Sequence, residues 1–237
     1  MEKRSEASLK QEKYYTETAE IYDRRGVEEI SYALFLLDGY IKRSKCKSVL
    51  DIGSGTGRAL HEIAASFPEI KFIGIEPNEA MRSVGHKRGI PKEKLVYGDA
   101  SKLEFKTDSF DVVTEFGVLH HAANPRAAVQ EMVRVARRGV FLCDSNNWGQ
   151  GSALARAVKF VLRKCRLWKL FIALSTRGKI YKFSEGDGVF YSFSLYEMLD
   201  IVSGKFPKIY IMNGDSPRIV YNGILQAPGI CVLATKD

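Results

Sequence analysis

The chain has 237 residues, of which 45% are hydrophobic and 27% charged, and its formal net charge is +8. This length is sufficient for one sizeable domain and too short for two full ones, and the positive charge permits an acidic partner but is far below the density of a dedicated nucleic-acid binder. The N-terminal segment MEKRSEASLKQEKYY has no apolar stretch and the four cysteines are widely spaced, so we expect no secretory signal, a cytoplasmic location, and reduced thiols rather than disulfides or a metal site.

Predicted strands and helices alternate along most of the chain. Residues 1–44 are predicted to be largely helical; from residue 48 onward, short apolar runs predict strands and apolar residues at helical spacing predict helices. The expected strands are 48–52, 71–76, 94–100, 109–116, 140–144, 208–213 and 229–237. The expected helices are 57–67, 78–89, 124–139 and 194–204. This alternation predicts an α/β fold with a doubly wound, mostly parallel, seven-stranded Rossmann-like sheet whose C-terminal edge is antiparallel.

The turn after the first strand is rich in glycine, with the sequence VLDIGSGTGR over residues 49–58. Ligands of such sheets bind beyond the carboxyl ends of the strands, and a GxGxxG turn there holds a pyrophosphate. Here Arg58 stands where the third glycine of that fingerprint would be, and Asp51 would repel a pyrophosphate. The turn therefore favours a ligand with a cationic end, because an acid in a partly dry cleft attracts positive charge.

Acidic residues also follow the second and third strands. Glu76 ends the second strand, at the place where an acid hydrogen-bonds ribose hydroxyls in dinucleotide-binding folds. Asp99 follows the third strand, and its ionised carboxylate can accept a hydrogen bond from an exocyclic amino group. Together with the glycine turn, these acids indicate a ligand that has an ammonium or sulfonium end, a ribose and an adenine, and no phosphate.

Four segments in order resemble successive motifs of the class I S-adenosylmethionine-dependent methyltransferases: VLDIGSGTGR, IGIEPNEAM, YGDASKLEF and FDVVTEFGVLHHAANPRAAVQEMVRVARRG. The resemblance covers roughly residues 45–145 and is nearest to the small-molecule branch that includes the ubiquinone-biosynthesis type. It implies S-adenosylmethionine as the cofactor and S-adenosylhomocysteine as the product. We expect a single methyltransferase domain over residues 1–237, consisting of an N-terminal helical lid (1–44), a cofactor-binding core (45–147), a basic helical cap insertion (148–190), and a C-terminal helix with edge strands (191–237).

The resemblance also assigns cofactor contacts to numbered residues. The N-terminal tyrosines Tyr14, Tyr15 and Tyr22 resemble a lid segment of this branch, in which Tyr22 is the first candidate to close over the cofactor. The expected contacts are Asp51, Gly53, Ser54, Gly55 and Gly57 at the methionine end, Glu76 at the ribose, Pro77, Met81, Asp99 and Ala100 around the adenine, Glu115, Phe116 and His120 near the methyl group, and Tyr22 in the lid.

Methyl transfer from a sulfonium depends mainly on placing the acceptor close to the methyl carbon, and it needs a base only if the acceptor arrives protonated. The candidate catalytic residues are His120, His121 and Glu115, for which a structural role in the turn after the fourth strand is the competing interpretation. The segment LCDSNNW, which contains Asp144, offers oxygen ligands for Mg²⁺. Because its pattern departs from the metal-dependent catechol type, we expect no metal and assign the segment to the turn or to the substrate pocket.

Residues 151–184 hold nine Lys or Arg residues and no Asp or Glu, with apolar residues at helical spacing. We therefore predict an amphipathic basic helix with a break near Gly178. Three interpretations are open. The segment is a cap whose apolar face packs on the domain and whose basic face is solvated, or a cap that selects an anionic acceptor or a lipid-linked one through peripheral membrane contact, or a phosphate contact for RNA.

The leading hypothesis is an enzyme that transfers a methyl group from S-adenosylmethionine to an oxygen or nitrogen of a small-molecule acceptor, such as a sugar, a lipid-linked intermediate or a secondary metabolite. An RNA methyltransferase is the first alternative, favoured by the net charge and the basic helix. The fourth strand, however, ends in TEFGVLHH, which has neither the Asn-Pro-Pro-aromatic signature of exocyclic-amine methylation nor a nucleophilic cysteine. We therefore do not expect nucleic acid as a partner. The second alternative is a cofactor-binding subunit without activity, and no oligomeric state is assigned.

Overall fold

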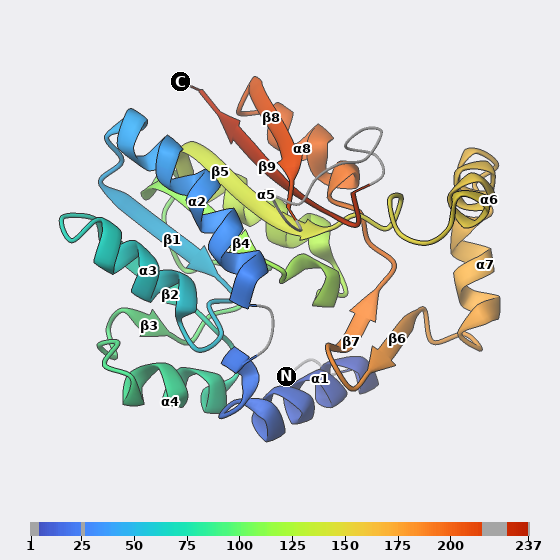
Figure 1. The fold of residues 1–237 in the computed structure, drawn as a ribbon, viewed down its shortest axis with the longest axis horizontal. Helices are drawn as coiled ribbons and strands as arrows, with labels where there is room; N and C mark the ends of the chain where they lie inside the picture. The colour runs from blue at the N-terminus through green and yellow to red at the C-terminus, as the bar shows by residue number, and fades with distance from the viewer. Residues whose placement is uncertain (1–4, 25–26, 215–226, 237) are drawn as a thin grey trace.

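A computed structural model describes residues 5–24, 27–214 and 227–236, and the side chains of residues 27–30 lie outside this description. Its centre is a sheet of seven strands in the order β3-β2-β1-β4-β5-β9-β8 (Figure 1). The strands β1 to β5 pair in parallel, whereas β9 runs antiparallel to both β5 and β8. The strands are β1 (Ser48–Ile52), β2 (Lys71–Ile75), β3 (Leu95–Val96), β4 (Phe110–Phe116), β5 (Ala136–Ser145), β8 (Lys208–Asn213) and β9 (Gly229–Thr235). This topology confirms the predicted fold class.

Helices cover both faces of the sheet and bury its apolar side chains. On one face, α2 and α3 pack on residues such as Val112, and on the other face α5 and α8 pack on residues such as Val113. These two neighbouring valines belong to different core clusters because successive side chains of a strand point to opposite faces. The helices are α1 (Glu6–Thr18), α2 (Val27–Ser44), α3 (Arg58–Ser66), α4 (Glu79–Lys87), α5 (Pro125–Val135) and α8 (Leu199–Ser203), with the 3₁₀ turns η1 (Tyr22–Arg24), η2 (Leu119–His121) and η3 (Leu195–Met198).

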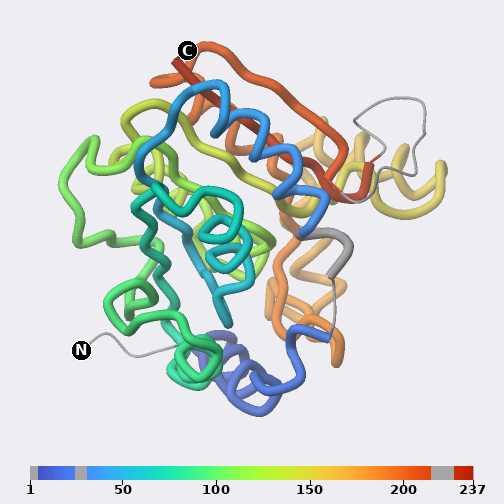
Figure 2. Tube along the Cα trace, turned by 60° about the vertical axis from the view of Figure 1, so that its left-hand side comes forward, coloured from blue at the N-terminus to red at the C-terminus, as the bar shows by residue number. Residues whose placement is uncertain are grey.

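The insertion after β5 differs from the predicted single helix. It forms two helices, α6 (Ala153–Lys164) and α7 (Trp168–Ser175). Figures 1 and 2 both show these helices away from the sheet. A break that we did not predict lies at Arg166, whose φ of 60° is left-handed and cannot continue a helix. The predicted break near Gly178 is present as well, since α7 ends at Ser175 and Gly178 has a φ of 82°. An antiparallel hairpin that we did not predict follows, made of β6 (Tyr181–Ser184) and β7 (Gly188–Tyr191).

Two of the four cysteines are joined, which contradicts the expectation that all are reduced. Cys143 of β5 and Cys231 of β9 form a disulfide, while Cys46 is buried and free and Cys165 is exposed and free. The bonded pair is directly opposite in the antiparallel register of the two strands. A pairing across 88 residues of sequence depends on that register, which the cysteine spacing does not reveal.

The helix expected over residues 124–139 ends earlier than predicted, because α5 stops at Val135 and β5 starts at Ala136. Lys205 marks this boundary: its Nζ donates to the carbonyl oxygen of Ala136 at 2.6 Å and to two carbonyls of the last helical turn. The ammonium group thereby satisfies main-chain acceptors that a helix end leaves without partners.

Replacing Lys205 by methionine should lower the free energy of unfolding by about 1–2 kcal/mol, because the end of α5 loses a charged donor. Chemical denaturation followed by circular dichroism measures this difference. Lys208→Met is the matched control, since Lys208 is exposed on β8 and its replacement should change stability by less than about 0.5 kcal/mol. Equal stabilities of the two variants would show that Lys205 does not cap α5.

Candidate functional site

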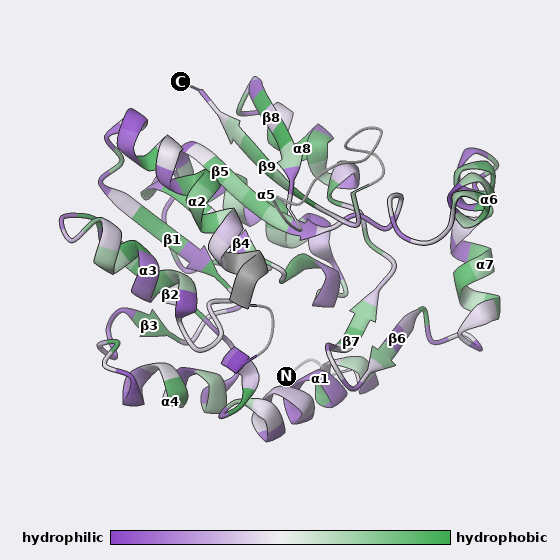
Figure 3. Cartoon of the chain, viewed as in Figure 1, coloured by the Kyte–Doolittle hydropathy of each residue, from purple (hydrophilic) through white to green (hydrophobic). Residues whose placement is uncertain are grey.

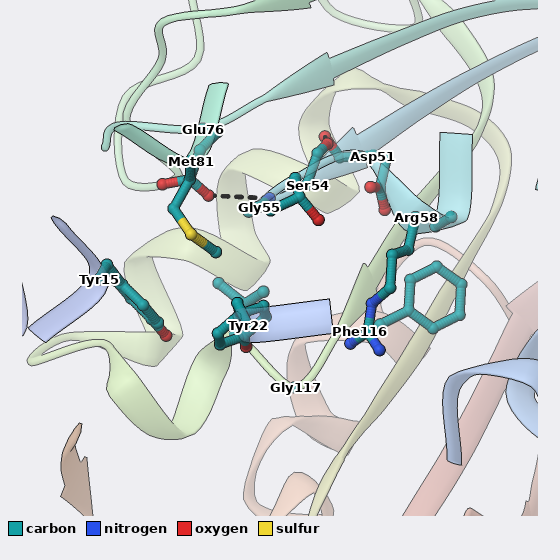
Figure 4. A pocket seen from close by; sticks show the side chains of 14 residues that line it. Tyr15, Tyr22, Asp51, Ser54, Gly55, Arg58, Glu76, Met81, Phe116 and Gly117 are labelled. Atoms are coloured by element: carbon teal, nitrogen blue, oxygen red, sulfur yellow. Dashed lines mark hydrogen bonds between the residues drawn. The ribbon is translucent and has the colours of Figure 1, made fainter. Parts of the chain in front are cut away.

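A pocket opens at the carboxyl ends of β1, β2 and β4, with residues of the N-terminal segment on its other side (Figure 4). Its empty volume, which includes space open to solvent, is about 480 Å³. The lining residues are Tyr15, Tyr22, Asp51, Gly53, Ser54, Gly55, Thr56, Arg58, Ala59, Glu76, Met81, Phe116, Gly117 and Val118.

The glycine turn brings main chain into one wall of this pocket through Gly53 and Gly55. Gly53, Gly55 and Gly57 have φ angles of 65°, 57° and 82°, a left-handed backbone that residues with a Cβ rarely adopt. A Cβ at Gly53 would also lie 2.5 Å from a side-chain carbon of Val118. Both the backbone conformation and the packing against Val118 therefore require glycine at this position.

Glu76 is fixed beside this turn at the end of β2. Its Oε2 accepts a hydrogen bond from the Gly55 N–H at 3.0 Å (Figure 4), and its Oε1 accepts one from the Asn78 N–H at 2.8 Å. Burial raises the pKa of Glu76 to about 7, although these two hydrogen bonds act in the opposite direction. Each carboxylate oxygen has a further lone pair, so the group can also accept hydrogen bonds from ligand hydroxyls.

Asp51 is the second buried acid of the pocket. Its Oδ1 accepts a hydrogen bond from the Thr114 hydroxyl at 2.8 Å. Burial raises the pKa of Asp51 to about 6, and no basic side chain is among the groups that shift it. Because a nearby cation would stabilise the ionised form of both acids, Asp51 and Glu76 together favour a positively charged ligand.

The N-terminal segment lies across the open side of the pocket. It brings Tyr15 and Tyr22 into the lining of the pocket. Their rings meet edge to face, with 5.8 Å between the ring centroids. Asp23 ties this segment to the glycine turn, since it accepts a hydrogen bond from the Thr56 hydroxyl at 2.6 Å and pairs with Arg58 at 3.4 Å. Tyr22 therefore lies where a lid residue is expected.

Asp144, at the end of β5, organises the turn that follows β4. It is buried, accepts a hydrogen bond from the Leu119 N–H at 2.7 Å, and contacts Nδ1 of His120 at 2.6 Å. Burial acts to lower the pKa of His120, but the charges of Asp144 and Asp187 outweigh it and raise the pKa to about 10. His120 is therefore an imidazolium at neutral pH in this arrangement, and it donates Nδ1–H to Asp144.

Asp187 faces the histidine pair from the tip of the β6–β7 hairpin. Its carboxylate oxygens lie 3.4 Å from Nε2 of His120 and 3.5 Å from Nε2 of His121. Partial burial acts to raise the pKa of Asp187, but hydrogen bonds from the two histidines hold it well below its usual range. The ligand atoms of the three side chains lie within 4.8 Å of one another, close enough to share a cation, although a protonated His120 cannot bind one.

Glu115 lies behind the pocket rather than in its wall. It is fully buried, and its Oε2 accepts a hydrogen bond from the Val118 N–H at 3.1 Å. Burial, together with the charge of Asp144, raises the pKa of Glu115 well above its usual range. A raised pKa favours the protonated carboxyl group, which cannot take a proton from an acceptor, and this argues against Glu115 as the base.

The structure brings only part of the expected cofactor set into the pocket. The expected contacts that line it are Asp51, Gly53, Ser54, Gly55, Glu76, Met81, Phe116 and Tyr22. The expected contacts outside its lining are Gly57, Pro77, Asp99, Ala100, Glu115 and His120. Asp99 is exposed and accepts a hydrogen bond from the Ser101 hydroxyl at 2.7 Å, so its contact with an adenine stays a prediction.

The segment after β5 has a structural role. Asn146 is buried, its Oδ1 accepts a hydrogen bond from the Ser194 hydroxyl at 2.8 Å, and its Nδ2 donates to the Ala227 carbonyl at 2.8 Å. These bonds hold the start of the insertion to the C-terminal part of the chain. Of the two interpretations of this segment, the geometry favours the turn over the substrate pocket.

Sequence reasoning missed several residues around the pocket. Val118 and Gly117 lie inside a recognised motif but carry no chemical signal of their own, and Arg58 was noted only as a departure from the dinucleotide fingerprint. Asp187 gave no signal, because it reaches the histidines only through the fold of the β6–β7 hairpin.

Comparison with known proteins finds a family model that matches part of this chain. Residues 50–143 match the model of a family described as a methyltransferase domain. A demethylmenaquinone methyltransferase of Roseiflexus sp. (strain RS-1) is 38% identical over 99 residues, which are 40% of this chain and 40% of that protein. The chain thus spans about two fifths of the length of this curated relative.

Solved structures share the fold over nearly the whole chain. One is a possible histamine N-methyltransferase from Thermotoga maritima, with a TM-score of 0.57, 17% identity, and coverage of 96% of this chain and 100% of that one. Another is the plantazolicin methyltransferase in complex with S-adenosylhomocysteine and a substrate analogue, with a TM-score of 0.58, 17% identity, and coverage of 98% and 97%. At these identities the likeness concerns the fold. Residues 50–143 thus match a methyltransferase domain, and the whole chain shares its α/β fold with these two methyltransferase structures.

Proposed function

We propose that the protein transfers a methyl group from S-adenosylmethionine to an oxygen or nitrogen atom of a small-molecule acceptor, such as a sugar, a lipid-linked intermediate or a secondary metabolite. The observation that carries this proposal is the pocket in which two buried acids, Asp51 and Glu76, flank an open glycine turn. A small-molecule acceptor agrees with the names of the relatives, which refer to demethylmenaquinone and to plantazolicin.

The acidic side chains of the pocket fit this cofactor. Glu76 can accept hydrogen bonds from ribose hydroxyls, and Asp51 attracts the positive charge of the methionine end. When bound, the cofactor supplies an activated methyl group on a sulfonium. Gly117 joins this pocket to His120, because it lines the pocket and a Cβ built on it would lie 3.8 Å from Cε1 of His120.

His120 is the best-placed group to take a proton from the acceptor. Asp144 fixes its ring through Nδ1, which leaves Nε2 as the exchanging nitrogen, and Asp187 lies 3.4 Å from that atom. An acceptor that displaces Asp187 removes one of the two carboxylates that hold the pKa of His120 high. The pKa of His120 then falls, which makes it easier for this residue to lose its proton and act as the base.

Lowering the pH from about 8 to about 6 should weaken S-adenosylhomocysteine binding roughly tenfold, because Glu76, with a pKa of about 7, becomes protonated. Affinity should fall as the pH falls, because only the ionised carboxylate accepts hydrogen bonds from both ribose hydroxyls, and this form is populated above the pKa. Titration calorimetry measures the affinity at each pH. In Glu76→Gln the affinity should be at least about tenfold weaker at pH 8 and vary little with pH. Wild-type affinity in this variant would remove Glu76 from the ribose role.

The acceptor class is tested with methyl-labelled S-adenosylmethionine, purified protein and a fractionated cell extract. We expect label in the small-molecule or lipid fraction and none in RNA. Label in RNA alone would replace the proposal with the RNA alternative. Cofactor binding without label in any fraction would favour a subunit without its own activity.

Removing the charge of Asp187 should make the proton transfer easier at neutral pH. In Asp187→Asn the pKa of His120 in the free enzyme falls, so the rising limb of the pH profile of kcat/KM should move down by roughly one pH unit or more. Glu185→Gln is the matched control, because Glu185 is an exposed acid on the same hairpin turn. In His120→Gln the limb should disappear. A limb that keeps its position in both His120→Gln and Asp187→Asn would exclude His120 as the base.

A further inference from the structure

The helical hairpin formed by α6 and α7 projects from the body of the protein. Figures 1 and 2 show it beyond the edge of the sheet, connected to it by the chain after β5 and by the β6–β7 hairpin. No residue from 151 to 187 is buried. An amphipathic cap that packs its apolar face on the domain would bury that face, so the first of the three interpretations of this segment is wrong.

The side of α6 that faces the body is basic rather than apolar. Lys159 donates from Nζ to the carbonyl oxygens of Asn147 at 2.8 Å and of Gln150 at 2.9 Å. Arg163 pairs with Glu197, and its guanidinium lies over the ring of Trp148 at 5.4 Å. Hydrogen bonds, an ion pair and a cation–π contact therefore attach the hairpin to the domain, and the apolar side of α6 takes no part in this attachment.

The apolar side of the hairpin faces solvent. Leu154, Val158 and Val161 of α6 follow one another at spacings of four and three residues, which places them on one face of the helix, and all three are exposed. Leu167, Leu170, Phe171 and Leu174 repeat the pattern at α7. Leu154 is 75% exposed and Leu174 is 72% exposed. Figure 3 shows these hydrophobic stretches at the outer edge of the molecule. We call these seven residues the apolar stripe.

The charge around the apolar stripe has one sign. Residues 151–184 contain nine Lys or Arg residues and no acid, and Lys164, Arg166, Lys169 and Arg177 are exposed next to the stripe. An apolar face bordered by basic side chains is the composition of helices that lie in the headgroup region of anionic membranes. No described helix is long and apolar enough to cross a bilayer, so contact of this kind would be made at the surface.

We infer that the α6–α7 hairpin docks the protein on an anionic lipid surface, with the apolar stripe inserted between the headgroups and the exposed basic residues on lipid phosphates. The positive charge around the apolar stripe favours an anionic lipid surface as the partner, because an uninterrupted basic border complements negative headgroups. This inference concerns the insertion and does not depend on the activity proposed for the pocket.

Flotation with vesicles tests the docking surface. The full chain should bind vesicles of phosphatidylcholine mixed with phosphatidylglycerol, and bind vesicles of phosphatidylcholine alone much more weakly. The double variant Leu154→Ser/Leu174→Ser should bind the anionic vesicles at least about tenfold more weakly, because two inserted side chains are lost. Phe35→Ser is the control, since Phe35 of α2 is an apolar residue of similar exposure, 72%, that lies outside the hairpin. It should bind like the wild type.

Separate variants test how much the exposed basic residues contribute to vesicle binding. Lys164→Glu/Lys169→Glu should reduce vesicle binding by about tenfold or more, and Lys92→Glu, which changes an exposed lysine of the loop before β3, should not. Affinity for S-adenosylhomocysteine, measured on every variant, reports that the pocket is intact and separates failure of docking from failure of the proposed activity. Three results would overturn the inference: equal binding to neutral and anionic vesicles, a wild-type dimer in sedimentation that Leu154→Ser/Leu174→Ser abolishes, or tight, salt-sensitive RNA binding through Lys164 and Lys169 without vesicle binding.

Discussion

Buried carboxylates at the carboxyl ends of the central parallel strands impose the main physical constraint on this molecule. Asp51, Glu76, Glu115 and Asp144 end or follow β1, β2, β4 and β5, and all four are almost fully buried. A buried charge is costly unless hydrogen bonds or an opposite charge compensate it. The fold meets this cost in different ways. Asp144 is paired with an imidazolium, burial favours the protonated form of Glu115, and the other two acids border the pocket.

The elements that sequence reasoning placed correctly depend on local signals. The glycine turn, the acid at Glu76 and the order of strands and helices can be predicted because turn chemistry and hydrophobic periodicity act over a few residues. The end of α5 was misplaced because its cap comes from Lys205, about seventy residues further along. The disulfide and the contact of Asp187 with the histidines were missed for the same reason, since each is made by tertiary structure between distant segments.

The α6–α7 hairpin shows a different limit of sequence reasoning. Periodicity correctly indicated an amphipathic helix, but it does not say which side faces the protein. Contacts outside the helix determine which side faces the protein. Lys159 binds the carbonyls of Asn147 and Gln150, and Arg163 pairs with the carboxylate of Glu197. Once these basic side chains are used for attachment, the opposite and apolar side is left to face outward.

The insertion connects the outer surface of the protein to the histidine pair His120 and His121. The chain passes from α7 into the β6–β7 hairpin, whose tip carries Asp187 against the histidine pair. Gln11 of α1 accepts a hydrogen bond from the Val189 N–H at 2.5 Å, so the helix that supplies Tyr15 to the pocket is attached to the same hairpin. The α6–α7 hairpin is therefore continuous with a segment that contacts both α1 and His120. This continuity links the lipid-docking surface that we infer to the site that we propose for methyl transfer.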